Sequence, residues 1–244
     1  MRKAFLKCRL LFVLLSLGSA QTDNAWAATI TVDTTADIVA TDAACSLREA
    51  VNNVNAMADT TGGDCVAATG GDIISLPAGR YTLTGATGDD ANLSGDLDIS
   101  NAVTIKGAGA AKTIINGNGA VTADGVIQVQ TAVGLTVDRI MITGGQASGQ
   151  NCPYNKNPDC FGGGIYSQGA VTVTKSTISG NAATTAGGGM TVFKGLLTVT
   201  NSTISGNASG DGGGIAGLGP TAIRNSTFSG NEAGRGGACI LKML

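Results

Sequence analysis

The chain has 244 residues, of which 38 are glycine, and aromatic residues make up only 4% of it. This composition is typical of a fold with many turns and thin, repetitive layers, and it argues against a bulky globular core. The formal net charge of −2 gives no electrostatic footprint for nucleic acid or for an anionic membrane surface.

Residues 1–27 have the pattern of a secretory signal peptide. Basic residues precede an apolar run at residues 10–17, and Ala25-Trp26-Ala27 offers small residues for cleavage. A membrane anchor is the alternative, but the run is far shorter than the ~20 residues that a span needs. We therefore predict an exported protein, extracellular or at the cell surface or outer membrane, whose mature chain starts near Ala28 and has no membrane span.

Cleavage would remove four basic residues and one acidic residue from totals of 15 and 17, leaving a net charge of −5. Five cysteines would remain, and an oxidising compartment allows them to pair. Cys152 and Cys160 flank a polar loop and are the first predicted pair. Cys45 and Cys65 bracket a predicted helix and are the second. Cys239 occupies a repeated apolar position and is predicted to be a buried filler.

Residues 28–71 are predicted to form an N-terminal cap. Thr29-Ile-Thr-Val-Asp33 alternates like a strand. In the segment Cys45-Ser-Leu-Arg-Glu-Ala-Val51, Ser46 and Glu49 form a capping box that starts a helix. Leu47, Ala50, Val51, Val54 and Met57 follow at helical spacing, and Gly62-Gly63 closes the element. A short amphipathic helix in a strand-rich chain is suited to cover the open first layer of a stack.

From residue 72 the predicted strands become short and regular. They are closed by Asn, Gly or a Pro-Ala-Gly turn, and they comprise residues 73–76, 80–84, 97–99, 103–105, 113–115, 126–129 and 135–143. About three short strands per ~25 residues are typical of a parallel β-helix. An antiparallel propeller is the competing repeat fold, but its blades use ~40 residues or more.

A repeat governs the C-terminal third. The pattern Asn-Ser-Thr-Ile-Ser-Gly-Asn recurs at 175–181, 201–207 and 225–231 with small changes. Stacked copies place Ile178, Ile204 and Phe228 in one inward ladder, and Val173, Val199 and Ile223 in another. Asn181, Asn207 and Asn231 are predicted to form a structural ladder at a turn, where Asn tolerates a left-handed backbone. Glycine clusters before each following strand supply positive φ.

The same repeat continues upstream in a less obvious form. A shift of 36 residues places Leu135, Val137 and Ile142 on Val171, Val173 and Ile178. The excess over one period matches the cysteine-flanked insert around residues 146–161. An insert that leaves the phase intact is predicted to lie on a loop outside the stack.

The segment Cys45-Ser-Leu-Arg-Glu-Ala-Val51, followed by residues 76–83 and 103–109, resembles the N-terminal region of CSLREA-type bacterial secreted β-helix proteins. The glycine-rich repeats are similar to theirs and, more loosely, to those of pectate-lyase-like and polymorphic outer-membrane proteins. The resemblance implies an all-β, right-handed parallel β-helix over residues 72–244, capped at its N-terminus and exported. It implies no single activity.

Candidate catalytic residues are sparse. Hydrolysis of a glycan needs two carboxylates about 5–10 Å apart, one with a raised pKa. The acids considered are Asp89, Asp90, Asp96, Asp98, Asp124, Asp138 and Asp211, with Asp89, Asp96 and Asp138 as the catalytic candidates. No repeated position carries an acid in neighbouring copies: Asp138 aligns with Thr174, Thr200 and Arg224. The chain has no histidine. Glu49 is explained by the capping box. No metal or cofactor is predicted, and calcium is the alternative.

Two functions remain. One is a secreted or cell-surface scaffold, adhesin-like and non-catalytic, with a polysaccharide or a host or cell-surface component as partner. The alternative is a polysaccharide lyase or glycoside hydrolase with its site in the loops at 84–98 and 124–160. The last copy of the repeat is incomplete at Leu244, and we expect the chain to be truncated relative to similar proteins.

Overall fold

A computed structural model describes residues 26–85, 91–148 and 158–241. Strands in parallel sheets dominate this part of the chain. Its helical segments are α1 (Leu47–Ala56), α2 (Gly119–Thr122) and a 3-10 turn, η1 (Pro158–Cys160). The predicted all-β parallel class is therefore confirmed. None of the helices in these ranges is long and apolar enough to cross a membrane.

The strands form four parallel sheets, here called A to D. Sheet A contains β1 (Thr29–Thr31), β2 (Asp72–Leu76), β5 (Val103–Gly107), β8 (Gly134–Asp138), β12 (Ala170–Thr174), β16 (Leu197–Thr200) and β20 (Thr221–Arg224). Sheet B contains β3 (Gly79–Thr82), β6 (Thr113–Asn116), β9 (Met141–Thr143), β13 (Thr177–Ser179), β17 (Thr203–Ser205) and β21 (Thr227–Ser229). Sheet C contains β4 (Leu97–Ile99), β7 (Ile127–Val129), β11 (Ile165–Ser167), β15 (Met190–Val192), β19 (Ile215–Gly217) and β23 (Cys239–Leu241). Sheet D contains β10 (Gln146–Ala147), β14 (Ala182–Ala186), β18 (Ala208–Asp211) and β22 (Glu232–Arg235).

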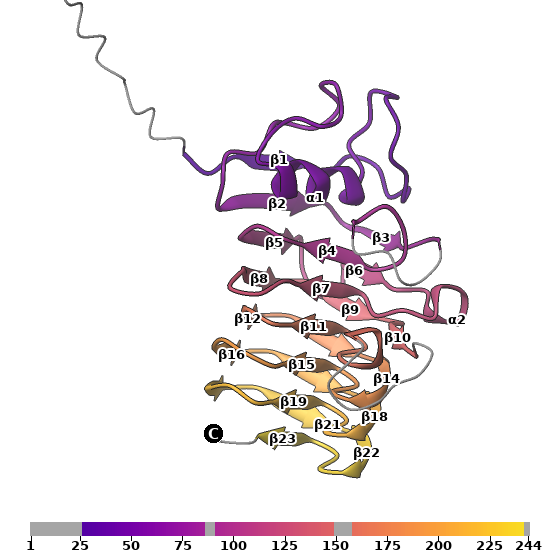
Figure 1. The fold of residues 1–244 in the computed structure, drawn as a ribbon, viewed down its shortest axis with the longest axis vertical. Helices are drawn as coiled ribbons and strands as arrows, with labels where there is room; N and C mark the ends of the chain where they lie inside the picture. Colours follow the sequence, from indigo (N-terminus) through magenta and orange to yellow (C-terminus); the bar gives the residue numbers. More distant parts are fainter. Residues whose placement is uncertain (1–25, 86–90, 149–157, 242–244) are drawn as a thin grey trace, which may run out of the picture.

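The chain passes through the sheets in a fixed order, and each pass is called a rung. The first rung comprises β2, β3 and β4, and the second comprises β5, β6 and β7. From the third rung, β8 to β11, a strand of sheet D is added before sheet C. Each strand pairs with the corresponding strands of the rungs before and after it, so the rungs stack along the long axis of the molecule (Figure 1).

The register of the repeats confirms the predicted inward ladders. Ile178 pairs with Ile204, which pairs with Phe228. Val173 pairs with Val199, which pairs with Ile223. These positions are fully buried except in the last rung, where Ile223 is 37% exposed. Identical residues stack at one strand spacing, about 4.8 Å, and this places one continuous apolar core inside the stack.

The asparagine ladder is present and hydrogen-bonded along the axis. Asn207 Oδ1 accepts the backbone N–H and the side-chain amide of Asn181, both at 3.1 Å. Asn231 Oδ1 accepts the same two groups of Asn207, at 3.1 and 3.0 Å. Each side chain therefore satisfies backbone groups of the neighbouring rung that the core would otherwise leave without partners.

The predicted left-handed backbone at these asparagines is wrong. Positive φ falls on the preceding glycines instead: Gly180, Gly206 and Gly230. A second left-handed column lies at the corner between sheets A and B and is formed by Arg139, Lys175, Asn201 and Asn225. The glycines at 162, 187, 212 and 236 have positive φ before their sheet C strands, as predicted.

At the N-terminal end, α1 contacts β2 and β4 of the first rung (Figure 1). Its capping box is confirmed: Glu49 receives the N–H of Ser46, and Ser46 Oγ receives that of Glu49. The helix ends earlier than predicted, because Met57 is its left-handed C-cap. Met57 therefore leaves the apolar face and is exposed.

The structure tests the cysteine predictions in part. Cys45 and Cys65 form the expected disulfide beside α1. Cys239 is a free thiol that pairs in register with Ile215 and packs against the core, but it is half-buried rather than buried as predicted; this partial burial raises its pKa. Cys160 is also disulfide-bonded, and its expected partner Cys152 lies outside the described residues.

Candidate functional site

The outer face of sheet C carries a row of side chains in register. Each three-residue strand turns its first and last side chains into the core and its middle one outward. Asp98, Gln128, Tyr166 and Thr191 occupy consecutive middle positions. Gln128 Nε2 donates to Asp98 Oδ1 at 3.3 Å. Asp98, Tyr166 and Thr191 are nevertheless buried, so other parts of the chain cover this face.

The segments that enter sheet C build a pocket over it. Asp96 directly precedes β4, Asp124 precedes β7 and Asp159 precedes β11. The three acids thus lie at the same corner of three consecutive rungs. With residues of β7 and β11 they line a narrow pocket that leaves no room for a water-sized molecule; the empty space in and around it, open solvent included, is about 180 Å³. The acidic, amide and aromatic side chains of its lining are those of Asp96, Asp124, Asp159, Gln128, Phe161 and Tyr166.

Asp96 has a perturbed pKa. The residue is 7% exposed, and no described residue donates a hydrogen bond to its carboxyl group. Burial raises the pKa of Asp96 well above its usual value, and the charges of Asp124, Asp98 and Asp159 raise it further, while Arg48 opposes them. This environment therefore favours the protonated form of Asp96.

The neighbouring carboxylates have hydrogen-bond partners. Asp124 Oδ1 accepts the N–H of Gly125 at 2.8 Å. Asp98 Oδ2 accepts the N–H of Asn92 at 3.1 Å, in addition to its bond from Gln128. Hydrogen bonds of this kind favour the ionised form of a carboxyl group. Asp96 differs from them, because no described residue donates a hydrogen bond to its carboxyl group.

Three aromatic rings lie beside the acids. Phe161 and Phe193 are 5.1 Å apart between ring centroids, and Tyr166 lies 5.6 Å from Phe193. The hydroxyl oxygen of Tyr166 accepts a hydrogen bond from Gln168 Nε2 at 3.0 Å. Burial raises the pKa of Tyr166, and the charge of Asp159 adds to this effect. Phe161 and Tyr166 thus form an apolar wall of the acidic pocket.

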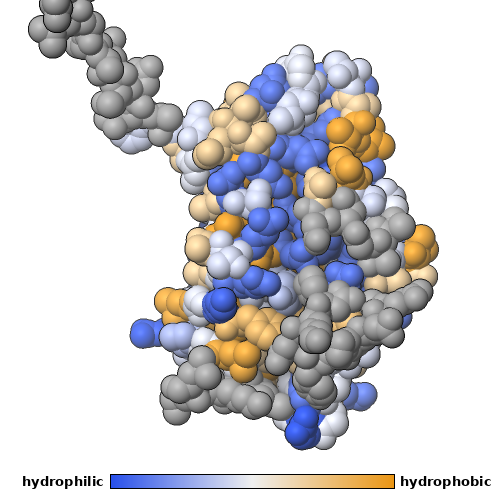
Figure 2. Space-filling view, in the orientation of Figure 1, coloured by the Kyte–Doolittle hydropathy of each residue, from blue (hydrophilic) through white to orange (hydrophobic). Residues whose placement is uncertain are grey.

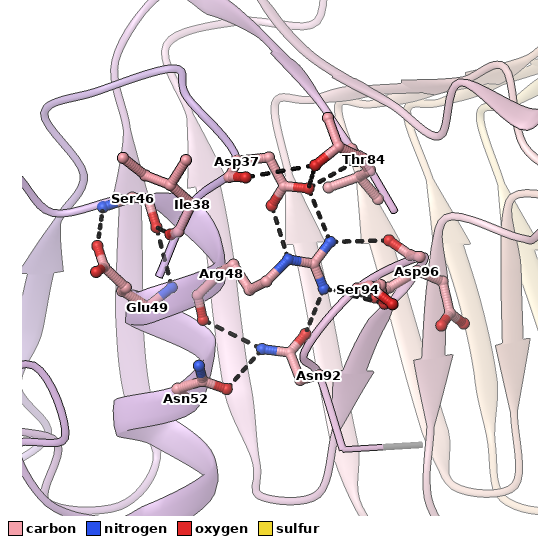
Figure 3. A network of polar contacts seen from close by, with 12 residues as sticks. Asp37, Ile38, Ser46, Arg48, Glu49, Asn52, Thr84, Asn92, Ser94 and Asp96 are labelled. Atoms are coloured by element: carbon pink, nitrogen blue, oxygen red, sulfur yellow. Dashed lines mark hydrogen bonds and ion pairs between the residues drawn. The ribbon is translucent and has the colours of Figure 1, made fainter. Parts of the chain in front are cut away.

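Arg48 of α1 fixes the segment that carries Asp96 (Figure 3). Its guanidinium group is buried and pairs with the Asp37 carboxylate at 2.7 and 3.0 Å. Its Nη atoms also donate to the backbone carbonyls of Gly95 at 2.8 Å and of Asp96 at 3.0 Å. In Figure 3 the carboxyl group of Asp96 points away from Arg48. Arg48 therefore positions the backbone of this segment without neutralising the Asp96 side chain by direct contact.

The structure separates the three catalytic candidates. Asp96 lies in the pocket. Asp138 lies in sheet A and makes a 3.9 Å ion pair with Arg139, outside the pocket lining. Asp89 lies outside the described residues. Two other acids that the sequence offered for a carboxylate pair, Asp98 and Asp124, do cluster with Asp96.

Asp159 is the pocket residue that sequence reasoning missed. The sequence could have indicated Asp159, because it is the single acid in the polar insert before Cys160.

Asp211, another acid noted in the sequence, forms an ion pair with Arg235 at 2.8 Å. Within residues 26–85, 91–148 and 158–241, no group of three or more acidic or cysteine side chains is arranged to hold a metal ion.

Comparisons with known proteins found no match for the chain. No protein-family model matches it, no curated protein matches it, and no solved structure matches it.

Proposed function

We propose that this protein is an exported, right-handed parallel β-helix that acts as a secreted or cell-surface scaffold of the adhesin-like kind. The fixed order of the strands through stacked parallel sheets supports the β-helix. The basic and apolar pattern of residues 1–27 supports export. The resemblance of the Cys45–Val51 segment to CSLREA-type secreted proteins supports both.

The observation that carries the binding function is the convergence of three connections on the outer face of sheet C. Asp96, Asp124 and Asp159 come from consecutive rungs and line one pocket there. At the same corner, the fourth to sixth rungs have glycine-rich segments, at 187–189, 212–214 and 236–238. Figure 2 shows hydrophilic residues gathered over the N-terminal half of the face in view, with apolar residues in separate patches. A polar face with several acidic side chains gathered at one corner suits recognition of a partner.

A second candidate function is that of a polysaccharide lyase or glycoside hydrolase. The observation that favours it is the raised pKa of Asp96 beside other carboxyl groups, which is the electrostatic arrangement of a general acid. The narrowness of the pocket argues against turnover, because a sugar ring must reach both carboxyl groups for hydrolysis.

The two functions are separated by incubating the exported protein with a panel of uronic-acid polysaccharides. Product release and retention on the immobilised polymers are measured in parallel. Retention without release supports the scaffold. Release that is lost in Asp96→Asn, with Asp89→Asn and Asp138→Asn compared, overturns the scaffold in favour of the enzyme.

A further inference from the structure

Cationic side chains gather along the corner where the chain passes from sheet A to sheet B. The structure describes nine lysine and arginine residues, of which Arg48 and Arg235 are held by Asp37 and Asp211. Six of the remaining seven lie at this corner or on the outer face of a strand beside it. They are all exposed and are here called the basic ridge: Arg80, Lys106, Lys112, Arg139, Lys175 and Arg224.

The basic ridge follows the axis of the stack. Lys106 and Arg224 occupy one outward column of sheet A, in which Asp138, Thr174 and Thr200 lie between them. Every rung from the first to the sixth except the fifth contributes at least one cation, over five strand spacings or about 24 Å. Asp138 is the one acidic side chain described along this line. A line of positive charge of this length is complementary to an extended anionic polymer.

Two of the cations occupy a corner position that does not favour them. Arg139 and Lys175 have φ values of 59° and 48°, and the equivalent residues of the next two rungs are Asn201 and Asn225. Asparagine adopts this left-handed conformation more readily than a long side chain does. Like charges on adjacent strands also repel each other, and no described residue forms an ion pair with Lys175. Backbone strain of this kind is found mostly at functional sites, and here it indicates that the positive charge serves a purpose other than folding.

The surfaces on both sides of the basic ridge are rich in hydroxyl groups. On sheet A, one outward position is threonine in four consecutive rungs: Thr104, Thr136, Thr172 and Thr198. On sheet B, the outward positions of the fourth to sixth rungs are Thr177, Ser179, Thr203, Ser205, Thr227 and Ser229. No aromatic residue occupies an outward position on the described strands of these two sheets.

This surrounding chemistry favours a polysaccharide over other anionic partners. Hydroxyl groups of the protein can hydrogen-bond with the hydroxyl groups of sugars. Single-stranded nucleic acids are typically held by aromatic side chains on which the bases stack. Membrane surfaces are typically held by large apolar side chains beside basic ones.

We propose that the basic ridge binds an extended uronic-acid polysaccharide that lies along the axis of the stack. Its carboxylates face the cations, and its hydroxyl groups face the flanking threonine and serine side chains. Several weak contacts along one polymer reinforce one another. The inference rests on the proposed scaffold function and names the chemical class of its partner. It assigns the contact to a corner that sheet B separates, along the chain, from the acidic corner before sheet C.

A binding titration of the exported protein with polygalacturonate tests the proposal. The control is the same polymer with its carboxyl groups methyl-esterified, which keeps the sugar backbone and removes the charge. We expect the protein to bind the charged polymer and to bind the esterified polymer far more weakly. Affinity for the charged polymer should fall as salt is added, because salt screens exposed charges.

Variants at the left-handed corner separate binding from folding. Arg139→Asn and Lys175→Asn introduce the residue that the next two rungs carry at this position, so neither should lower the thermal midpoint. Each should weaken binding by about two- to fivefold, the effect of one exposed ion pair, and together they should weaken it by about tenfold. Asn201→Lys adds a cation in the fifth rung and should strengthen binding by about two- to fivefold.

Lys194→Gln is the matched control. Lys194 is an exposed lysine that follows β15, at the corner between sheets C and A. Its loss should change the affinity less than twofold. Equal weakening by Lys194→Gln, or equal binding of the esterified polymer, would mean that the basic ridge is not the binding surface and would overturn the proposal.

Other outcomes separate the basic ridge from the scaffold function. Tighter binding of single-stranded DNA or of anionic phospholipid vesicles than of polygalacturonate would overturn the choice of a polysaccharide. Retention of polygalacturonate that the corner variants leave unchanged would remove the basic ridge and leave the scaffold function standing. No retention of any polymer in the panel would count against both the basic ridge and a polysaccharide as partner of the scaffold.

Discussion

The first three rungs and the last three rungs use the same sheets but differ at the corner before sheet C. In the fourth to sixth rungs this corner is a glycine-rich turn of constant length, and it follows the asparagine ladder. In the first three rungs it is a longer, irregular connection that carries an acid. The regular corners support stacking, whereas the irregular corners place acidic side chains at the edge of sheet C.

The two regions also satisfy buried polar groups in different ways. The repeats use many equivalent amide contacts, one set per rung. In the N-terminal region one arginine, Arg48, holds both Asp37 and the segment before β4. Loss of one contact should therefore be more costly in the N-terminal region than in the repeats.

The largest expected effect comes from Arg48→Ala. It leaves the Asp37 carboxylate, 5% exposed, without its charge partner, and breaking such a buried pair costs about 3–5 kcal/mol. Urea denaturation should show this loss in the free energy of unfolding. The matched control is Arg139→Ala, whose side chain is 47% exposed in its ion pair and should cost below ~1 kcal/mol. Similar values for the two variants would contradict the special role of Arg48.

Asn207→Ala should have the next largest effect. It leaves the buried backbone N–H of Asn181 without its acceptor, and an unsatisfied buried group costs about 1–3 kcal/mol. Asn231→Ala makes the same change one rung later, where the side chain is only half-buried, and should cost less. If Asn231→Ala were the more damaging variant in the same denaturation experiment, burial along the ladder would not control its strength.

Asp96→Asn should change stability in a pH-dependent way. The raised pKa of Asp96 means that the folded state holds its proton more tightly than the unfolded state does. The stability from this proton is fully present below the unfolded pKa of about 3.9 and is lost as the pH rises through the folded pKa. The variant should therefore gain thermal stability relative to the wild type from acidic to neutral pH. A difference between the two midpoints that is constant with pH would contradict the raised pKa.

The smallest effect is expected from Arg235→Ala. Its ion pair with Asp211 has short distances of 2.8 Å, but the arginine side chain is 73% exposed. Solvent screening limits such a pair to about 0–1 kcal/mol. A cost in denaturation as large as that of Asn207→Ala would show that the last rung depends on this pair.

The repeats were predictable because each position recurs with the same neighbours. The ladders of Ile178 and Asn181 followed from the period alone, as did the place of Cys239. The backbone conformation of Asn181 did not follow, because both residues of each Gly-Asn pair tolerate a left-handed backbone and the glycine adopts it at lower steric cost.

The acidic pocket was not predictable by the same reasoning. A search for acids at equal phase finds no ladder, since Asp96, Asp124 and Asp159 precede their sheet C strands by one, three and six residues. The corners differ in length, and only the three-dimensional path brings the carboxyl groups together. The burial of Arg48 could not be predicted from the sequence for a similar reason, because its partners lie up to 48 residues away along the chain.

The stacking of rungs has a mechanical consequence. Each strand contacts the strands of the rungs on either side, so the rungs of the stack act like links in series. Under tension from the C-terminal end, the chain should release one link at a time. In the repeats each release frees 24 to 26 residues, which extend to roughly 80–90 Å. A pulling record of this protein would then begin with nearly equal steps and continue with longer ones in the first three rungs, where equivalent positions are 31, 32 and 36 residues apart.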